Sequence, residues 1–314
     1  MRYLVTGVAG FIGSTLATRL LSEENEVVGV DTFHNYYDSS IKEHNISALL
    51  KAKNFNFYKL DICELQTASF ESKFDCIFHL AGQPGVRDSW SQGFDSYSYN
   101  NVLGTQRVLD YAVSSKIKKI VYSSSSSIYG DAESYPTLEN AMPLPASPYG
   151  VSKLAGEFLC DSYVRNYELS AYSLRYFTVY GPRQRPDMAT NRLIKCALES
   201  QTFQKFGSGE QIRDFTYVDD IVEANYLAAL NDPKNSHSKL NVGGGSGVTL
   251  NQLIEQIEDI TGKKIKLDLR GKSVGDAQKT GASIKLAKET LGWEPATKLR
   301  LGLEKQVAWQ SSLL

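Results

Sequence analysis

The run Tyr3-Leu4-Val5-Thr6, followed at once by Gly7-Val8-Ala9-Gly10-Phe11-Ile12-Gly13, decides the fold. The first four residues predict a short buried strand, and the apolar spacing of residues 11–22 predicts an amphipathic helix. Glycines between the two permit a tight turn, and the start of the helix offers free N–H groups to an anion. This order predicts a site for the pyrophosphate of a dinucleotide. The residues expected to contact the cofactor here are Gly7, Gly10, Phe11, Ile12 and Gly13.

A carboxylate ends the second expected strand, Glu26–Asp31. Asp31 stands about 20 residues beyond the glycine turn, the spacing at which such folds place an acid on the adenosine ribose. A carboxylate accepts hydrogen bonds from ribose hydroxyls and repels a 2′-phosphate, so the sequence predicts NAD rather than NADP. Asp61 and Ile62 end the third strand, where they are expected to meet the adenine, although a turn explains an aspartate there equally well.

Strand patterns alternate with helical patterns through the first part of the chain, for example with a helix over Val102–Ser115. This alternation predicts an α/β fold, a Rossmann-like doubly wound parallel sheet with helices on both faces. Ligands of such sheets bind at the carboxyl ends of the strands. The expected strands are Tyr3–Thr6, Glu26–Asp31, Phe55–Asp61, Asp75–Ala81, Lys119–Ser123 and Ala171–Phe177.

The pattern changes after about residue 180, where Gly181-Pro182 interrupts the alternation. We therefore expect residues 1–176 to form the NAD-binding domain, with 215–243 returning to it. Residues 177–314 are expected to form a smaller C-terminal substrate-binding lobe. Within that lobe, Thr249 is expected to cap a helix over Leu250–Thr261.

Polar residues gather at the expected strand ends. Ser147-Pro148-Tyr149-Gly150-Val151-Ser152-Lys153 places a phenol and an ammonium on one face of a helix. An adjacent positive charge favours the phenolate, so this pair is suited to acid–base chemistry. The serine run 123–127 ends the fifth strand and offers hydroxyls to a substrate, and Leu80-Ala81-Gly82 lets the backbone lie under the cofactor. Together these features predict Tyr149 and Lys153 as catalytic residues.

Composition excludes several other classes. A net charge of -1 with 22% charged residues gives no basic field for a nucleic acid. The 4 histidines and 4 scattered cysteines lack metal-ligand spacing, so no metal is expected. No apolar run approaches the roughly 20 residues that span a bilayer. The start of the chain lacks the pattern of a signal peptide, so we expect a cytoplasmic protein without a membrane partner.

At this point the chain resembles the extended short-chain dehydrogenase/reductase superfamily, and within it the NAD-dependent nucleotide-sugar epimerases and dehydratases. The resemblance implies bound NAD, a UDP-sugar substrate and a homodimer built from two helices of each subunit. It adds Asn100, Ser123 and Tyr176 to the cofactor-binding residues. The motifs that carry it are the GxxGxxG loop, Asp31, Asp61-Ile62, His79-Leu80-Ala81-Gly82, Asn100-x3-Gly104-Thr105, the serines with Ile128-Tyr129-Gly130, Tyr149-x3-Lys153, Arg175-Tyr176-Phe177 with Gly181-Pro182, and Arg213-Asp214-Phe215 with Asp220.

The same resemblance narrows the activity. The family places its catalytic hydroxyl four positions before the tyrosine of the Tyr129-Gly130 motif, which here is Ser125. The acidic residues of the family's 4,6-dehydratases are missing beside it, which argues against dehydration. The stretch from Arg175 to Ala189, with Thr178 and Arg185, is similar to UDP-glucuronate 4-epimerases. Arginine suits a sugar carboxylate, although Arg185 could instead pair with Asp187.

The resemblance therefore implies 4-epimerisation of UDP-glucuronate to UDP-galacturonate through a transient 4-keto sugar. The implied substrate-binding residues are Arg87, Ser125, Ser126, Ser127, Tyr149, Thr178, Arg185, Gln211, Arg213 and Asp276. Three alternatives stay open: a UDP-glucose/galactose 4-epimerase, a UDP-glucuronate decarboxylase, and a catalytically silent NAD-binding regulator.

Overall fold

The structure is a computed structural model that describes residues 1–68, 70, 73–233, 236–271 and 277–314. A seven-stranded sheet in the order β10-β6-β5-β4-β1-β2-β3 forms its centre, and every neighbouring pair is parallel. Its strands are β1 (Arg2–Thr6), β2 (Glu26–Asp31), β3 (Phe55–Lys59), β4 (Cys76–His79), β5 (Lys119–Ser125), β6 (Ser170–Tyr176) and β10 (His237–Val242). From β1 the chain builds the sheet first towards β3 and then towards β10, which leaves a ligand crevice where the direction reverses.

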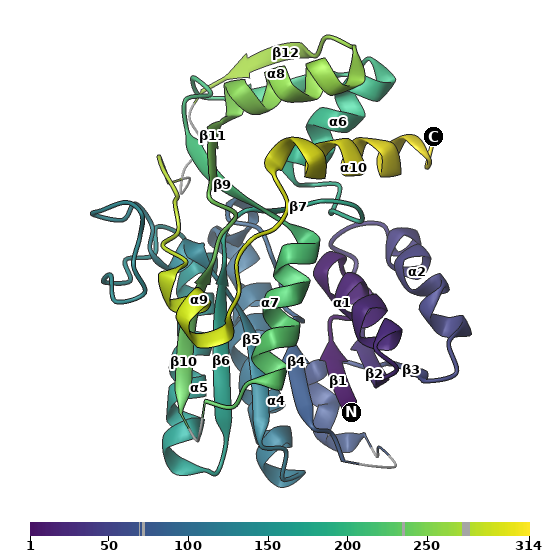
Figure 1. Ribbon diagram of the computed structural model, residues 1–314, viewed down its shortest axis with the longest axis vertical. Helices are drawn as coiled ribbons and strands as arrows, with labels where there is room; N and C mark the ends of the chain where they lie inside the picture. Colours follow the sequence, from purple (N-terminus) through teal and green to yellow (C-terminus); the bar gives the residue numbers. More distant parts are fainter. Residues whose placement is uncertain (69, 71–72, 234–235, 272–276) are drawn as a thin grey trace.

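Helices cover both faces of this sheet (Figure 1). Helices α1 (Phe11–Ser22) and α7 (Val218–Leu230) pack together on one face, and α4 (Gly104–Ser114) and α5 (Pro148–Asn166) pack together on the other. The central strands β1, β4, β5 and β6 are buried on both sides, which explains why their sequences are largely apolar. The predicted doubly wound parallel sheet is confirmed.

Capping residues mark the ends of helices α5 and α8. The Ser147 hydroxyl accepts a hydrogen bond from the Gly150 N–H at 3.2 Å and so begins α5, with Pro148 in its first turn. Helix α8 (Leu250–Thr261) begins with the expected cap, in which Thr249 and Gln252 exchange hydrogen bonds. It ends at Gly262, whose φ of 66° is a left-handed conformation.

Several elements were not expected from the sequence. Helix α2 (Ser39–Ser47) packs against α1, although its apolar and polar residues are poorly segregated. A π-helical segment, η5 (Ser98–Leu103), precedes α4. The remaining short helical segments are η1 (Leu49–Lys51), η2 (Ile62–Thr67), η3 (Arg87–Ser89), η4 (Ser91–Gly93), α3 (Phe94–Tyr97) and η6 (Ser126–Ile128).

Most of the chain beyond residue 176, apart from α7, β10 and α9, forms a cap above the carboxyl ends of the strands (Figure 1). It contains a three-stranded sheet in the order β11-β9-β7 and a two-stranded sheet of β12 and β8. Its elements are β7 (Val179–Tyr180), α6 (Ala189–Glu199), β8 (Thr202–Phe206), β9 (Ile212–Tyr217), β11 (Ser246–Thr249), α8, β12 (Lys266–Arg270) and α10 (Leu299–Ser311), while α9 (Lys285–Leu291) lies beside β10. Within the segment 215–243, α7 and β10 join the main sheet, whereas β9 pairs with β7 and β11. The division at residue 176 stays a prediction.

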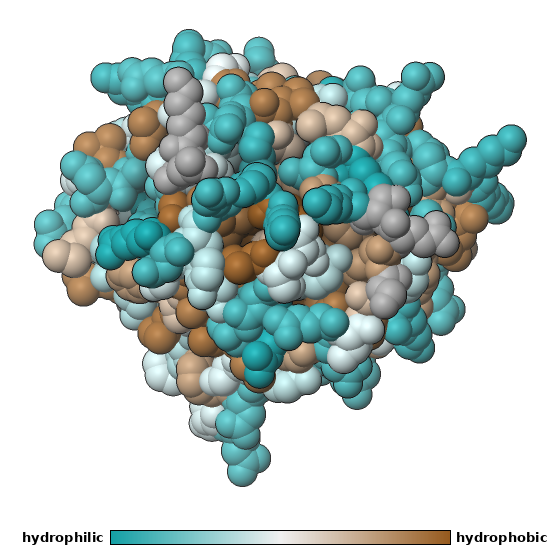
Figure 2. All heavy atoms as spheres, turned by 90° about the horizontal axis from the view of Figure 1, so that it is seen from below, coloured by the Kyte–Doolittle hydropathy of each residue, from teal (hydrophilic) through white to brown (hydrophobic). Residues whose placement is uncertain are grey.

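One apolar core connects the cap to the sheet. It runs from Tyr3 and Val5 in the sheet to Leu193, Leu253 and Leu303 in the cap. The outer face at the opposite end, seen in Figure 2, is mostly hydrophilic, with apolar groups scattered between polar side chains. Among the described residues, no helix combines the length and apolar character needed to cross a membrane.

Candidate active site

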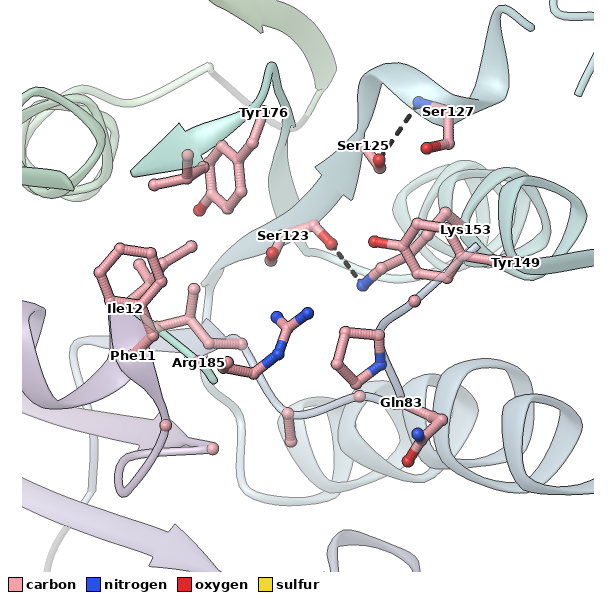
Figure 3. A pocket seen from close by; sticks show the side chains of 18 of the residues that line it. Phe11, Ile12, Gln83, Ser123, Ser125, Ser127, Tyr149, Lys153, Tyr176 and Arg185 are labelled. Carbon is pink, nitrogen blue, oxygen red and sulfur yellow. Dashed lines mark hydrogen bonds between the residues drawn. The ribbon is translucent and has the colours of Figure 1, made fainter. Parts of the chain in front are cut away.

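A cavity of about 440 Å³ lies at the carboxyl ends of the strands (Figure 3). All the residues predicted to bind the cofactor line it, and so do most of those predicted for the substrate. The predicted residues along its wall are Gly7, Gly10, Phe11, Ile12, Gly13, Asp31, Asp61, Ile62, Leu80, Ala81, Gly82, Asn100, Ser123, Ser125, Ser126, Ser127, Tyr149, Lys153, Tyr176, Thr178, Arg185 and Arg213. Residues more than 200 positions apart in the chain thus meet at one site.

Three predicted substrate residues are not placed on this wall. The Arg87 guanidinium lies 4.5 Å from the centre of the Phe206 ring. The Gln211 side chain donates to the Phe206 carbonyl at 3.2 Å. Both therefore gather at the end of β8 rather than around the cavity. Asp276 lies outside the described residues.

The glycine turn forms a cradle that admits no side chain. Gly7 has a φ of 69°, and a Cβ there would lie 2.7 Å from the Ala81 nitrogen. A Cβ on Gly13 would lie 2.2 Å from the Gly7 carbonyl oxygen. Gly10 precedes α1 without a side-chain cap, so the first N–H groups of the helix face the cavity end of the turn. These residues fit a pyrophosphate group.

Asp31 closes β2 and holds the same turn. Its carboxylate accepts hydrogen bonds from the Ala9 N–H at 3.2 Å and the Phe33 N–H at 2.8 Å. Lys42 of α2 lies 3.3 Å from it, and the sequence did not single out this lysine. An ionised carboxylate has about four acceptor positions, so Asp31 retains capacity for a ribose hydroxyl.

Tyr149 and Lys153 both face the cavity from α5 (Figure 3). Lys153 Nζ donates to the Ser123 carbonyl at 2.7 Å and lies 5.0 Å from the centre of the Tyr122 ring. Burial lowers the pKa of Lys153 to about 8. The ammonium is thus anchored to β5, one helical turn from the phenol.

The environment of the Tyr149 phenol has opposing effects on its pKa. Burial raises the pKa of Tyr149, while a hydrogen bond with Ser125 and the charge of Arg185 act to lower it. That Lys153 favours the phenolate stays a prediction, and with a pKa of about 8 this lysine is still mostly protonated at neutral pH. The chain alone therefore leaves the phenol above its ordinary pKa, and further positive charge is needed to make it a base at neutral pH.

A buried ion pair fixes α5 against the strands. Glu157, on the same face of α5 as Tyr149 and Lys153, binds Arg175 of β6 at 2.8 and 2.9 Å. Ser124 Oγ donates to Glu157 at 2.5 Å, whereas Ser125 Oγ accepts from the Ser127 N–H at 3.1 Å. Within the serine run, the Ser124 hydroxyl thus binds the buried ion pair, whereas the Ser125 hydroxyl bonds Ser127 and Tyr149 beside the cavity. The sequence did not distinguish them.

Asn101 is a positioning residue that the sequence did not single out. Its amide group exchanges hydrogen bonds with the backbone of Gln83 at 2.6 and 2.9 Å and donates to Ser152 on α5 at 2.9 Å. It therefore fixes the loop beside the cavity, while Asn100 lines the cavity and donates to Ser96. The π-helical turn sets which asparagine points where, and a sequence pattern does not reveal that turn.

The cavity wall also contains Thr178, Arg185 and two tyrosines that the sequence did not single out, Tyr36 and Tyr37. The Arg185 guanidinium contacts Asp187 through two hydrogen bonds of 3.0 Å each. Tyr36 donates to Asp88 at 2.7 Å. The ion pair that the sequence allowed for Arg185 is therefore present, and Arg185 still extends into the cavity (Figure 3). Arginine, threonine and phenol groups make this part of the wall suited to a polar, anionic group.

Comparison with known proteins decides the family. The model of the NAD dependent epimerase/dehydratase family matches residues 3–243. The chain belongs to this family. It is 42% identical, over all of its length and 99% of the relative, to a Bacillus subtilis protein described as an uncharacterised UDP-glucose epimerase.

Two further relatives act on a uronate according to their names. A UDP-glucuronate 4-epimerase of Thermodesulfobacterium geofontis is 39% identical over 98% of this chain and 95% of its own. The crystal structure of a UDP-glucuronic acid 4-epimerase from Bacillus cereus, in complex with UDP-glucuronic acid and NAD, superimposes with a TM-score of 0.94 at 38% identity. It covers 100% of both chains. These members of the family share the complete architecture with this chain.

Proposed function

We propose that this protein is an NAD-dependent UDP-sugar 4-epimerase that converts UDP-glucuronate to UDP-galacturonate through a transient 4-keto sugar. The observation that carries the proposal is the placement of Arg185 and Thr178 in the same cavity as Tyr149 and Lys153. A guanidinium recognises a carboxylate with matched geometry, so the sugar's C5 substituent is expected there. The named relatives support the same substrate.

NAD is the proposed cofactor, because the cradle fits its pyrophosphate and Asp31 can accept its ribose hydroxyls. Leu80, Ala81 and Gly82 would lie under it, and Asp61 and Ile62 would meet the adenine. When bound, NAD accepts hydride from carbon 4 and returns it, and its positive ring adds the charge that favours a phenolate at Tyr149. Because it is regenerated in each cycle, the cofactor is expected to stay bound.

Side chains of the protein itself would remove and return the proton of the sugar 4-hydroxyl. Tyr149 takes the proton of the sugar 4-hydroxyl. Ser125 would hydrogen-bond both the Tyr149 phenol and this sugar hydroxyl, so it can relay the proton between them. Lys153, anchored on the Ser123 carbonyl, keeps a positive charge behind the phenol. After the ketone turns in the cavity, Tyr149 returns the proton to the new hydroxyl. Such general base catalysis contributes about 10²–10⁴-fold, and positioning supplies most of the rest.

A uronate adds a hazard, because its 4-keto form is a β-keto acid. Loss of CO₂ requires the bond to the carboxylate to align with the carbonyl π system. An epimerase must therefore hold that bond near the carbonyl plane. Thr178 and Arg185, which line the cavity, would restrain the carboxylate in this way.

Product analysis tests the proposal. The protein is incubated with UDP-glucuronate without added NAD, and the products are followed by NMR. Formation of UDP-galacturonate is expected. The name of the Bacillus subtilis relative favours a second candidate, a UDP-glucose/galactose 4-epimerase. Interconversion of only those neutral sugars would contradict the uronate assignment, release of CO₂ with a UDP-pentose would indicate a decarboxylase, and no turnover of any UDP-sugar would indicate a regulator.

A homodimer and a cytoplasmic location are also proposed. Val151 and Phe158 are seven residues apart on α5, so they share a face, and their exposed fractions are 48% and 58%. Tyr99 and Leu103, next to α4, are also exposed. An apolar face on these helices suits a second copy of the chain. The 4 cysteines are free thiols, which suits a reducing compartment.

A further inference from the structure

Arg185 lines the cavity and is held by an acidic partner two residues further along the chain. Asp187 accepts from Nε and Nη2 of the guanidinium, each at 3.0 Å. This pairing occupies one edge of the planar group. Nη1 lies on the opposite edge and makes no hydrogen bond within the described part of the chain, so it is available to a ligand.

The backbone that carries the pair is fixed. The Met188 N–H donates to the Arg185 carbonyl at 3.2 Å, and the Asn191 side chain donates to the Gln184 carbonyl at 2.8 Å. Gln184 is buried and bonds Val179 and Gln306. Because this turn cannot shift easily, the direction of the guanidinium depends mainly on Asp187.

The pair also sets the charge of this part of the cavity wall. Asp187 neutralises most of the positive charge of Arg185, and the other groups near the guanidinium are the phenols of Tyr36, Tyr37 and Tyr149. The side chains of Arg185 and Asp187 are 19% and 34% exposed, so water screens the pair only in part. The carboxylate subsite is therefore close to neutral before a ligand enters.

We propose that Asp187 is a specificity-determining residue, which presents one edge of Arg185 to the substrate carboxylate and limits the strength of that contact. The inference rests on the proposed function. The sugar must turn between loss and return of hydrogen at carbon 4, so its carboxylate has to leave Arg185 in every cycle. Binding that is equally strong in all states lowers KM without helping the reaction, and here it would slow the turn.

The test compares the wild-type holoenzyme with Asp187→Asn, which has nearly the same shape and keeps one acceptor oxygen for Arg185 but removes the charge. Dissociation constants for UDP-glucuronate and UDP-glucose are measured by calorimetry, and kcat and KM are measured for UDP-glucuronate. We expect the variant to bind UDP-glucuronate roughly fivefold more tightly, to bind UDP-glucose unchanged, and to have a lower kcat together with a lower KM.

Asp88→Asn is the matched control, because it removes a carboxylate near the same tyrosines without touching Arg185. Its ratio of the two dissociation constants should stay at the wild-type value. Unchanged or weaker binding of UDP-glucuronate by Asp187→Asn overturns the inference, and so does an equal gain in Asp88→Asn. Bound NAD and the melting temperature show whether the variants are folded. Failure of the proposed function would be seen separately, as absent turnover of UDP-glucuronate by the wild type.

Discussion

At the residue scale, the central group is the Tyr149 hydroxyl, which the protein buries and then compensates only in part. Ser125 and Arg185 act to lower its pKa, but burial dominates in the chain alone. A phenol in this state needs additional positive charge nearby, which lowers its pKa, before it can act as a base. Tyr149 is thus expected to act as a base only when the active site holds its cofactor.

Replacing Tyr149 by Phe removes only that hydroxyl. We expect turnover of UDP-glucuronate to fall by at least about 10²-fold, because general base catalysis is lost. The amount of NAD released on denaturation should match the wild type. Tyr167→Phe, which changes an exposed tyrosine just beyond the same helix, is the control. Substantial residual turnover in Tyr149→Phe would exclude the phenol as the base.

The lowered pKa of Lys153 predicts a pH dependence of stability. Between pH 8 and 10.5 the unfolded chain keeps a proton that native Lys153 has lost, so the free energy of unfolding rises with pH across this window. Urea unfolding at pH 7.5 and 10 should show the wild type gaining about 1–3 kcal/mol relative to Lys153→Met. A difference that is constant with pH would show that burial does not shift this lysine.

A site residue could be predicted from the sequence when a short motif defines it. Gly7, Asp31, Tyr149 and Lys153 were found because each is defined by spacing within one turn or one strand end. The roles of Asn101 and Lys42 were not found, since a π-turn and the packing of a weakly amphipathic helix place them.

At the element scale, the glycine turn is the feature with the least tolerance for change. Gly7 and Gly13 lie against backbone atoms, which cannot move aside as a flexible side chain would. The strands and the helices that flank them were predicted because buried parallel strands are apolar throughout and end at polar residues. Helix α2 lacks that contrast, and β7, with only two residues, is too short for a period to be read.

Gly13→Ala tests this element. The new methyl group would overlap the Gly7 carbonyl, so the turn must widen. We expect at least about tenfold weaker retention of NAD and a loss of about 1–3 kcal/mol in stability. Gly247→Ala, where the nearest neighbour is 3.5 Å away, is the control and should change neither. NAD content and chemical unfolding measure both effects, and a Gly13→Ala protein with full NAD content would contradict the cradle.

At the scale of the whole molecule, the cap and the sheet share one core, and the cavity lies where they meet. The alternation of strands and helices predicted the sheet. Residues 215–243 were expected to return to the sheet, and α7 and β10 do so; the pairing of β9 with β7 and β11 in the cap was not predicted, because these strands are distant in the sequence. The cavity is therefore built by long-range pairing that the local patterns do not encode.

Phe158→Glu tests the proposed assembly. A charge in the middle of an apolar helix face would have to be buried against its copy, so the dimer should weaken at least about tenfold. Size-exclusion chromatography with light scattering is expected to show a dimer for the wild type and a monomer for the variant at the same concentration. Leu314→Glu, at the exposed end of the chain, is the control. An unchanged dimer in Phe158→Glu would place the interface elsewhere.

The central claim is that this cavity oxidises and then re-reduces carbon 4 of a uronate with a cofactor that never leaves. The most direct measurement uses UDP-glucuronate with deuterium at carbon 4, in ordinary water and without added NAD. We predict UDP-galacturonate that retains the deuterium at carbon 4, as read by NMR and mass spectrometry. Loss of the deuterium to solvent, or a labelled UDP-pentose in place of the galacturonate, would contradict the account.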